Sequence, residues 1–162
     1  MCILCWNHKY LKYVNVKGTA LTEVQLNSDG GSLTEIYYPT TIQSIQLINQ
    51  RLLEVLGLPY VDGVAESLYT VSIENCPRIY KLNDSSDESV YSSFKGMAYV
   101  NNLTLKNCLD IITTMNYTGF SNLQSMTLIN MGKLTSLGFD EMNLLTSTGM
   151  LKYIKVSGCD NL

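Results

Sequence analysis

One short apolar frame recurs along this chain and constrains its fold more than any other feature. Six anchor residues are each followed by an apolar residue three positions later and by another five positions later. The anchors are Leu11, Ile42, Leu68, Val100, Leu123 and Leu151. The position seven residues after each anchor is filled by Gly18, Asn49, Asn75, Asn107, Asn130 and Gly158. Alternate apolar residues followed by a turn residue are typical of a short β-strand with one buried face. Six copies in register predict one short strand that is used repeatedly and stacked on itself.

In such a strand the residues at +3 and +5 point inward, and the residues at +2, +4 and +6 point outward. An Asn at +7 is expected to close the strand, because its amide can bond to backbone groups of its own and neighbouring coils. A second apolar pair follows most turns, for example Leu21 with Val24 and Leu52 with Val55. The chain is therefore expected to wind around a shared interior instead of folding back as hairpins.

The spacing of the copies leaves two β-rich architectures open. The anchors are 31, 26, 32, 23 and 28 residues apart, and an extra half-unit at Leu33–Pro39 lies between the first two. The first prediction is a β or α/β solenoid with one strand per coil in a parallel sheet. In this solenoid, short helical or irregular segments at 64–68, 90–100 and 139–145 lie on the side of each coil opposite the parallel sheet. The alternative is a β-solenoid with two strands per coil, favoured by hops of 10, 12, 9 and 10 residues from Leu11 through Leu21, Leu33 and Ile42 to Leu52.

The frame resembles the leucine-rich repeat signature, L-x-x-L-x-L-x-x-N/C. The clearest matches are LYTVSIENC, from Leu68 to Cys76, and VNNLTLKNC, from Val100 to Cys108. The half-unit LTEIYYP, from Leu33 to Pro39, resembles the bacterial surface-antigen (BspA-like) variety, in which a proline follows the strand. The resemblance also extends to the cysteine-containing type. It implies an irregular leucine-rich repeat array, a bacterial cell-surface or extracellular location, and a part in adhesion or recognition.

Residues 1–162 are expected to form a single solenoid. Repeat arrays need polar caps to shield their outer coils, and neither end of this sequence shows one. We therefore expect a segment of a larger protein, or a chain that self-associates through its uncapped ends.

Composition narrows the classes of partner. The net charge is −3 and no run of Lys or Arg occurs, which argues against nucleic-acid binding. No apolar stretch approaches the ~20 residues of a membrane span, so no membrane insertion is expected. Three of the five cysteines, Cys76, Cys108 and Cys159, share the +8 position of the frame. Cysteine packs as a small buried hydrophobe, so we interpret this column as inert core thiols.

Catalytic and metal-binding patterns are weak. His8 is the one histidine, and no nucleophile motif lies near it. Cys2, Cys5 and His8 have the spacing of three zinc ligands, but no fourth ligand is evident. The acidic stretch with Asp84, Asp87 and Glu88 lacks the spacing of a calcium loop and is interpreted as a solvated loop. We therefore predict no enzyme activity, no cofactor and no metal.

The outward strand positions are the strongest candidates for binding, because repeat proteins commonly bind through one continuous face. These positions are rich in hydroxyl and amide groups and low in charge, which suits a protein or glycan partner better than a phosphate. The candidate residues are Tyr13, Asn15, Gln46, Ile48, Thr70, Ser72, Glu74, Thr104, Lys106, Thr127, Ile129, Tyr153 and Lys155. The predicted function is a non-catalytic protein- or glycan-binding domain for recognition or adhesion. The alternative is a structural subunit of a bacterial surface layer or phage particle.

Overall fold

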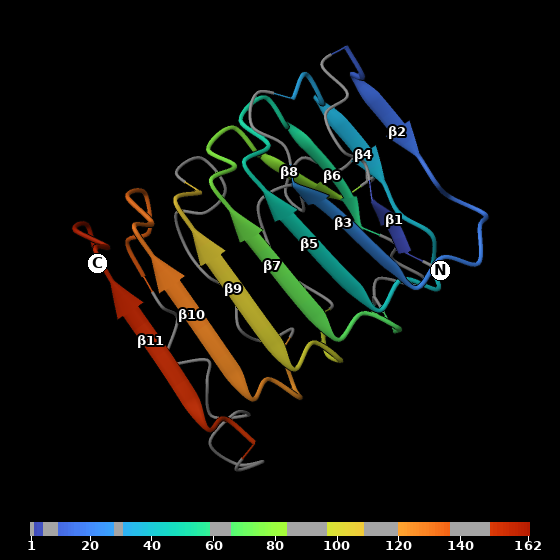
Figure 1. Cartoon of the computed structure of the whole chain (residues 1–162). Coiled ribbons are helices and arrows are strands. Elements are labelled where there is room, and N and C mark those ends of the chain that lie inside the picture. Colours follow the sequence, from blue (N-terminus) through green and yellow to red (C-terminus); the bar gives the residue numbers. More distant parts are fainter. Residues whose placement is uncertain are drawn as a thin grey trace.

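The structure is a computed structural model that describes residues 2–4, 10–27, 31–58, 66–83, 97–108, 120–136 and 150–162. Within these ranges the chain contains strands β1–β11 and no helix (Figure 1). Seven strands form the larger sheet: β1 (Cys2–Leu4), β3 (Glu23–Asn27), β5 (Ser44–Ile48), β7 (Thr70–Glu74), β9 (Asn102–Lys106), β10 (Ser125–Ile129) and β11 (Tyr153–Ser157), adjacent in that order. Four strands form the smaller sheet: β2 (Tyr13–Asn15), β4 (Glu35–Tyr37), β6 (Val55–Leu58) and β8 (Lys81–Asn83).

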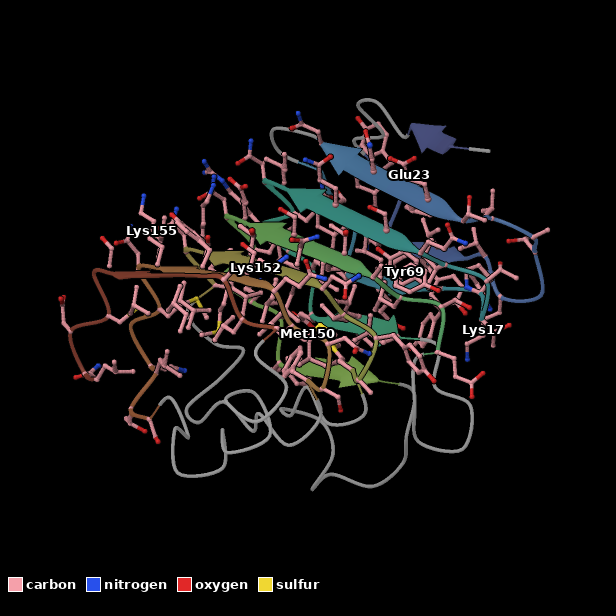
Figure 2. All side chains as sticks on the ribbon, turned by 90° about the horizontal axis from the view of Figure 1, so that it is seen from below. Lys17, Glu23, Tyr69, Met150, Lys152 and Lys155 are labelled. Atoms are coloured by element: carbon pink, nitrogen blue, oxygen red, sulfur yellow. The ribbon has the colours of Figure 1, made fainter. Side chains whose placement is uncertain are left out.

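Every strand pair in both sheets is parallel. The chain alternates between the two sheets from β1 to β9, and β10 and β11 then follow in the larger sheet. Figures 1 and 2 show the smaller sheet on one side of the larger one. The prediction of a β-rich fold with parallel strands is therefore confirmed, and the arrangement is compatible with a β-solenoid. Up to β9, each return to the larger sheet passes through one strand of the smaller sheet, as the two-strand alternative requires.

The inward columns of the repeated frame form the core. In the larger sheet, Leu47, Ile73, Leu105 and Leu128 occupy one register row and are completely buried. Ile36 and Leu56 of the smaller sheet are equally buried and belong to the same hydrophobic cluster. Full burial of one such side chain contributes about 1.5–3 kcal/mol, so apolar residues of both sheets hold the sheets together. The repeated frame identified those of β5, β7, β9 and β10.

A left-handed residue ends each strand from β5 to β11 in the larger sheet. Asn49, Asn75, Asn107 and Asn130 have φ angles between 52° and 60°, and Gly158 has a φ of 64°. L-residues other than Asn and Asp rarely adopt this conformation. The Asn or Gly at +7 is therefore explained by the backbone of the turn.

The four asparagine side chains of these turns form a ladder. Nδ2 of Asn75 donates to Oδ1 of Asn49 at 2.8 Å, Asn107 donates in the same way to Asn75, and Asn130 donates to Asn107 at 2.8 Å. The sequence predicted bonds from these amides to the backbone, and did not indicate that they bond to one another. The ladder connects each turn to the next.

The prediction was wrong about the sheet to which the first copy of the frame belongs. The strand after Leu11 is β2, which pairs with β4 in the smaller sheet. The position beside β5 is taken by β3, which follows Leu21 and places Val24 next to Ile45. Strands of both sheets bury apolar residues against one core, so the frame identifies a strand without identifying its sheet.

One smaller expectation also needs correction. Leu53 is fully buried where Leu52 was expected, and Leu52 is 37% exposed. The described parts of the three segments expected to be helical or irregular, residues 66–68 and 97–100, contain turns and no helix. The remaining residues of those segments lie outside the described ranges.

Candidate functional site

The outward side chains of the larger sheet form three parallel rows across β3, β5, β7, β9, β10 and β11. The register gives the first row as Glu23, Ser44, Thr70, Asn102, Ser125 and Tyr153. The second row is Gln25, Gln46, Ser72, Thr104, Thr127 and Lys155, and the third is Asn27, Ile48, Glu74, Lys106, Ile129 and Ser157. We call these three rows the strand face. They lie on the side of the sheet away from the core, as the alternating burial of β3, β5, β7, β9 and β10 shows.

Most side chains of the strand face are half-buried against their neighbours in the rows. Among the described residues the face holds a single ion pair, between Nζ of Lys106 and Oε1 of Glu74 at 3.0 Å. Glu23 also accepts a hydrogen bond from Nε2 of Gln25. Figure 2 shows Glu23 and Lys155 at opposite ends of the sheet. The middle of the face therefore offers hydroxyl and amide groups beside one internally neutralised charge pair.

The structure brings eleven of the thirteen predicted site residues together on this face. They are Gln46, Ile48, Thr70, Ser72, Glu74, Thr104, Lys106, Thr127, Ile129, Tyr153 and Lys155. Tyr13 and Asn15 do not belong to it, because β2 lies in the smaller sheet. Their assignment to the strand face was wrong for the same reason as the sheet assignment of β2.

Sequence reasoning missed Glu23, Gln25 and Asn27, the outward residues of β3. The signal was available: Leu21, Val24 and Leu26 repeat the anchor, +3 and +5 pattern, and Leu21 precedes Ile42 by 21 residues. An alignment that started from Leu21 instead of Leu11 would have placed β3 beside β5.

Tyr13 and Asn15 contribute to a separate cluster on the smaller sheet. The rings of Tyr13 and Tyr37 lie 5.6 Å apart between centroids, and Nζ of Lys17 lies 5.0 Å from the centre of the Tyr37 ring. Nδ2 of Asn15 donates to the Tyr13 hydroxyl at 3.2 Å. A Cβ at Gly57 would clash with the Tyr37 ring, so a larger residue there would require the ring to shift. Burial, and then the hydrogen bond to Glu35, raise the pKa of Tyr37.

The prediction placed all three cysteines of the column in the core, and the structure buries two of them. Cys76 and Cys108 are buried free thiols, while Cys159, also free, is partly exposed. The Cys76 thiol donates to the carbonyl of Glu74 at 3.3 Å, and the Cys108 thiol donates to that of Lys106 at 3.2 Å. Burial raises the pKa of Cys76 to about 12 and that of Cys108 to about 11. A thiol must lose its proton to act as a nucleophile or metal ligand, so these two are chemically inert at neutral pH.

No group of three His, Cys, Asp or Glu side chains that could hold a metal occurs in the part of the chain that the structure describes. The side chains of the Cys2, Cys5 and His8 set lie outside that part, as do Asp84, Asp87 and Glu88. None of the described segments contains a helix long and apolar enough to cross a membrane.

Comparisons with known proteins add no family to this geometry. No protein-family model matches the chain. No curated protein and no solved structure matches it significantly either.

Proposed function

We propose that this chain is a non-catalytic recognition domain that binds a protein or glycan through the strand face. In this proposal the fold is an irregular leucine-rich-repeat-like β-solenoid, and a bacterial surface or extracellular location accompanies an adhesive function. The observation that carries the proposal is the continuity of the three rows, because their register is unbroken from β3 to β11.

The chemistry of the rows suits a neutral, polyhydroxylated or peptide surface. In the second row Gln46, Ser72, Thr104 and Thr127 follow one another on adjacent strands. Strand neighbours lie ~4.8 Å apart, so a ligand that crosses the strands meets one hydrogen-bonding group at each step. Because the side chains are partly held by their neighbours, binding would order few additional rotamers, and this lowers its entropic cost.

The test is a binding screen with the whole chain. A panel of neutral and acidic oligosaccharides is the first probe, and a panel of purified surface proteins is the second. For any ligand found, Thr104→Arg should raise the dissociation constant at least about tenfold, or about 1.4 kcal/mol, because a long charged side chain then stands in the middle row.

The matched control is Tyr13→Ala, which removes an exposed aromatic side chain from the smaller sheet and should leave binding unchanged. If Thr104→Arg binds like the unmodified chain while Tyr13→Ala loses affinity, the strand face is not the binding surface. Circular dichroism of both variants confirms that the strands are intact.

A further inference from the structure

A fourth row of residues adjoins the strand face where the strands of the larger sheet begin. The N–H of Tyr69 donates to the carbonyl of Gln43 at 2.9 Å, and the N–H of Asn101 donates to the carbonyl of Tyr69 at 2.8 Å. The same backbone pattern joins all members of the row, which are Thr22, Gln43, Tyr69, Asn101, Gln124 and Lys152. We call them the entry row. Each directly precedes a first-row residue, so the entry row extends the strand face by one row.

Over the four strands β5, β7, β9 and β10 this extended face carries no charge outside its third row. The charged residues surround it: Glu23 lies on β3, and the ion pair of Glu74 with Lys106 lies in the third row. The uncharged positions are Gln43, Ser44 and Gln46 on the first strand, Tyr69, Thr70 and Ser72 on the second, Asn101, Asn102 and Thr104 on the third, and Gln124, Ser125 and Thr127 on the fourth. We call these positions the neutral panel.

The polar side chains of the neutral panel are available to other molecules. Within the described ranges, none of them takes part in a side-chain hydrogen bond or an ion pair. An amide offers two donors and an acceptor, and a hydroxyl offers one donor and two acceptors. On the smaller sheet, by contrast, Asn15 bonds to Tyr13, and Tyr37 bonds to Glu35. The panel therefore presents donors and acceptors with which the hydroxyl groups of a ligand can pair.

Tyr69 supplies the one aromatic ring of the neutral panel. It directly precedes β7, the central strand of the larger sheet, and its side chain is 42% exposed (Figure 2). Gln43 and Asn101 precede the strands on either side, one strand spacing or ~4.8 Å away. The face of a tyrosine ring is apolar enough to contact the C–H groups of a sugar ring. Amides on both sides of the ring can then bond to the sugar hydroxyls.

We propose that the neutral panel binds an uncharged oligosaccharide, with one sugar ring stacked on Tyr69 and its hydroxyl groups bonded to Gln43 and Asn101. This inference rests on the proposed function and narrows its ligand to one class. A protein partner fits the panel less well, because the centres of protein interfaces are apolar and often use Arg. The panel contains neither an aliphatic residue nor Arg. An acidic glycan or a phosphate fits less well because the panel has no cation to pair with it.

The test is titration of the whole chain with oligosaccharides by isothermal titration calorimetry. The neutral probes are oligomers of glucose, mannose, galactose and N-acetylglucosamine, and the acidic probes are oligogalacturonate and a sulfated oligosaccharide. At least one neutral probe should bind, and no acidic probe should bind more tightly. The dissociation constant for the neutral probe should be the same at low and high salt, because no charges pair across the interface.

Substitutions locate the bound sugar. Tyr69→Ala should raise the dissociation constant at least about tenfold, because it removes the stacking surface. Tyr69→Phe retains the ring and should bind nearly as well as the unmodified chain. Gln43→Met keeps the length of the side chain but loses the amide, and should weaken binding about fivefold.

Tyr13→Ala is the matched control. It removes a ring that is 52% exposed on the smaller sheet and should leave binding of the neutral probe unchanged. Circular dichroism should be the same for all variants, because the substituted side chains of Tyr69, Gln43 and Tyr13 are exposed.

Two results would overturn the inference. The first is that no neutral probe binds, whatever else the chain binds. The second is a neutral probe that binds Tyr69→Ala as tightly as it binds Tyr13→Ala. Failure of the proposed function is measured separately: a protein or acidic ligand that Thr104→Arg weakens would keep the strand face as the binding surface while excluding a neutral glycan.

Discussion

The larger and smaller sheets share one core but differ in regularity. From β3 to β11 the larger sheet pairs five-residue strands without a register break. The smaller sheet has strands of three or four residues and a register shift between β6 and β8.

Apolar burial does not explain the difference, because Ile36 and Leu56 of the smaller sheet are as buried as Leu105 of the larger one. The turns do differ: four turns of the larger sheet are joined by the asparagine ladder. In the smaller sheet Gly18 supplies a left-handed turn after β2, with nothing within 4 Å of its Cβ position. Apolar residues therefore make the strands of both sheets, and connected turns accompany the unbroken register of β5, β7, β9 and β10.

The largest expected effect tests whether both sheets contribute to one core. Leu105→Ala and Leu56→Ala each remove a completely buried side chain. Each should lower the free energy of unfolding by about 2–5 kcal/mol, because a lost side chain leaves a cavity that the surroundings fill only in part. Urea denaturation followed by circular dichroism measures the loss. A cost below 1 kcal/mol for Leu56→Ala alone would mean that the smaller sheet is not part of the cooperative unit.

The second effect separates two contributions to stability at Asn107: the left-handed backbone of the turn and the hydrogen bonds of the asparagine ladder. Asn107→Ala removes two side-chain hydrogen bonds and places an alanine at a φ of 52°. We expect a loss of about 2–3 kcal/mol, from about 1 kcal/mol per bond and about 1 kcal/mol of strain.

Asn107→Gly keeps the conformation and loses only the ladder bonds, so its cost should be smaller by about 1 kcal/mol. The exposed Asn102, at the start of the strand β9 that precedes Asn107, is the control, and Asn102→Ala should change stability by less than about 0.5 kcal/mol. Equal losses for Asn107→Ala and Asn107→Gly would show that the left-handed backbone contributes nothing.

The third effect is a pH dependence of stability. It comes from the two buried thiols that follow the turns of β7 and β9. Burial raises the pKa of Cys76 from 9.0 to about 12 and that of Cys108 from 9.0 to about 11. The unfolded chain therefore releases these protons near pH 9 while the folded chain retains them. This stabilisation is fully present below pH 9 and is lost as the pH rises through the window from 9 to 12.

Each thiol can lower stability by up to ~1.4 kcal/mol per pH unit in that window. Burial also raises the pKa of Tyr38, which acts in the same direction. Thermal melts between pH 8 and about pH 11 should show the decline, and Cys76→Ala should make it shallower. A decline that is equally steep in Cys76→Ala would remove this thiol from the explanation.

The smallest expected effect is a gain in stability from a substitution next to strand β4 of the smaller sheet. Tyr38 follows β4 and is 1% exposed, and its hydroxyl has no hydrogen-bond partner in the described part of the chain. Tyr38→Phe removes this unsatisfied group without changing the packed ring. Stability should stay the same or rise by about 1 kcal/mol, as measured by the urea midpoint. A clear loss would reveal a bond that the hydroxyl makes in solution.

The contrast between the larger and the smaller sheet also explains how much of the fold could be predicted from the sequence. The anchor and its +3 and +5 residues identified strands β5, β7, β9, β10 and β11, because alternate burial leaves a direct trace in the residue types. The +7 position identified the left-handed turns, because few residues other than Gly and Asn tolerate them. The sheet of β2 was misassigned because the alignment began at Leu11, whereas the same apolar pattern counted from Leu21 places β3 beside β5.

The candidate site residues were likewise placed well where the anchors were aligned well, and misplaced where the alignment was wrong. Its residues on β5 to β11 lie together on one face of the larger sheet, because they were counted from anchors that the strands follow. Tyr13 and Asn15 were misplaced along with their strand, and Glu23, Gln25 and Asn27 were missed with β3. Hydrogen bonds among the asparagine amides could not be predicted, because they depend on the rotamers of side chains in separate turns.

The central claim is that the chain alternates between two sheets. The most direct test of this claim is to determine which strand lies next to β5. Gln25 and Gln46 are register partners in the structure, whereas alignment of the six anchors alone would set Asn15 beside Gln46. Paired cysteines can be introduced at these positions after Cys2, Cys5 and Cys159 are changed to serine. The account predicts rapid disulfide formation in the Gln25→Cys, Gln46→Cys protein and none between Asn15→Cys and Gln46→Cys. The opposite result would contradict the two-sheet arrangement.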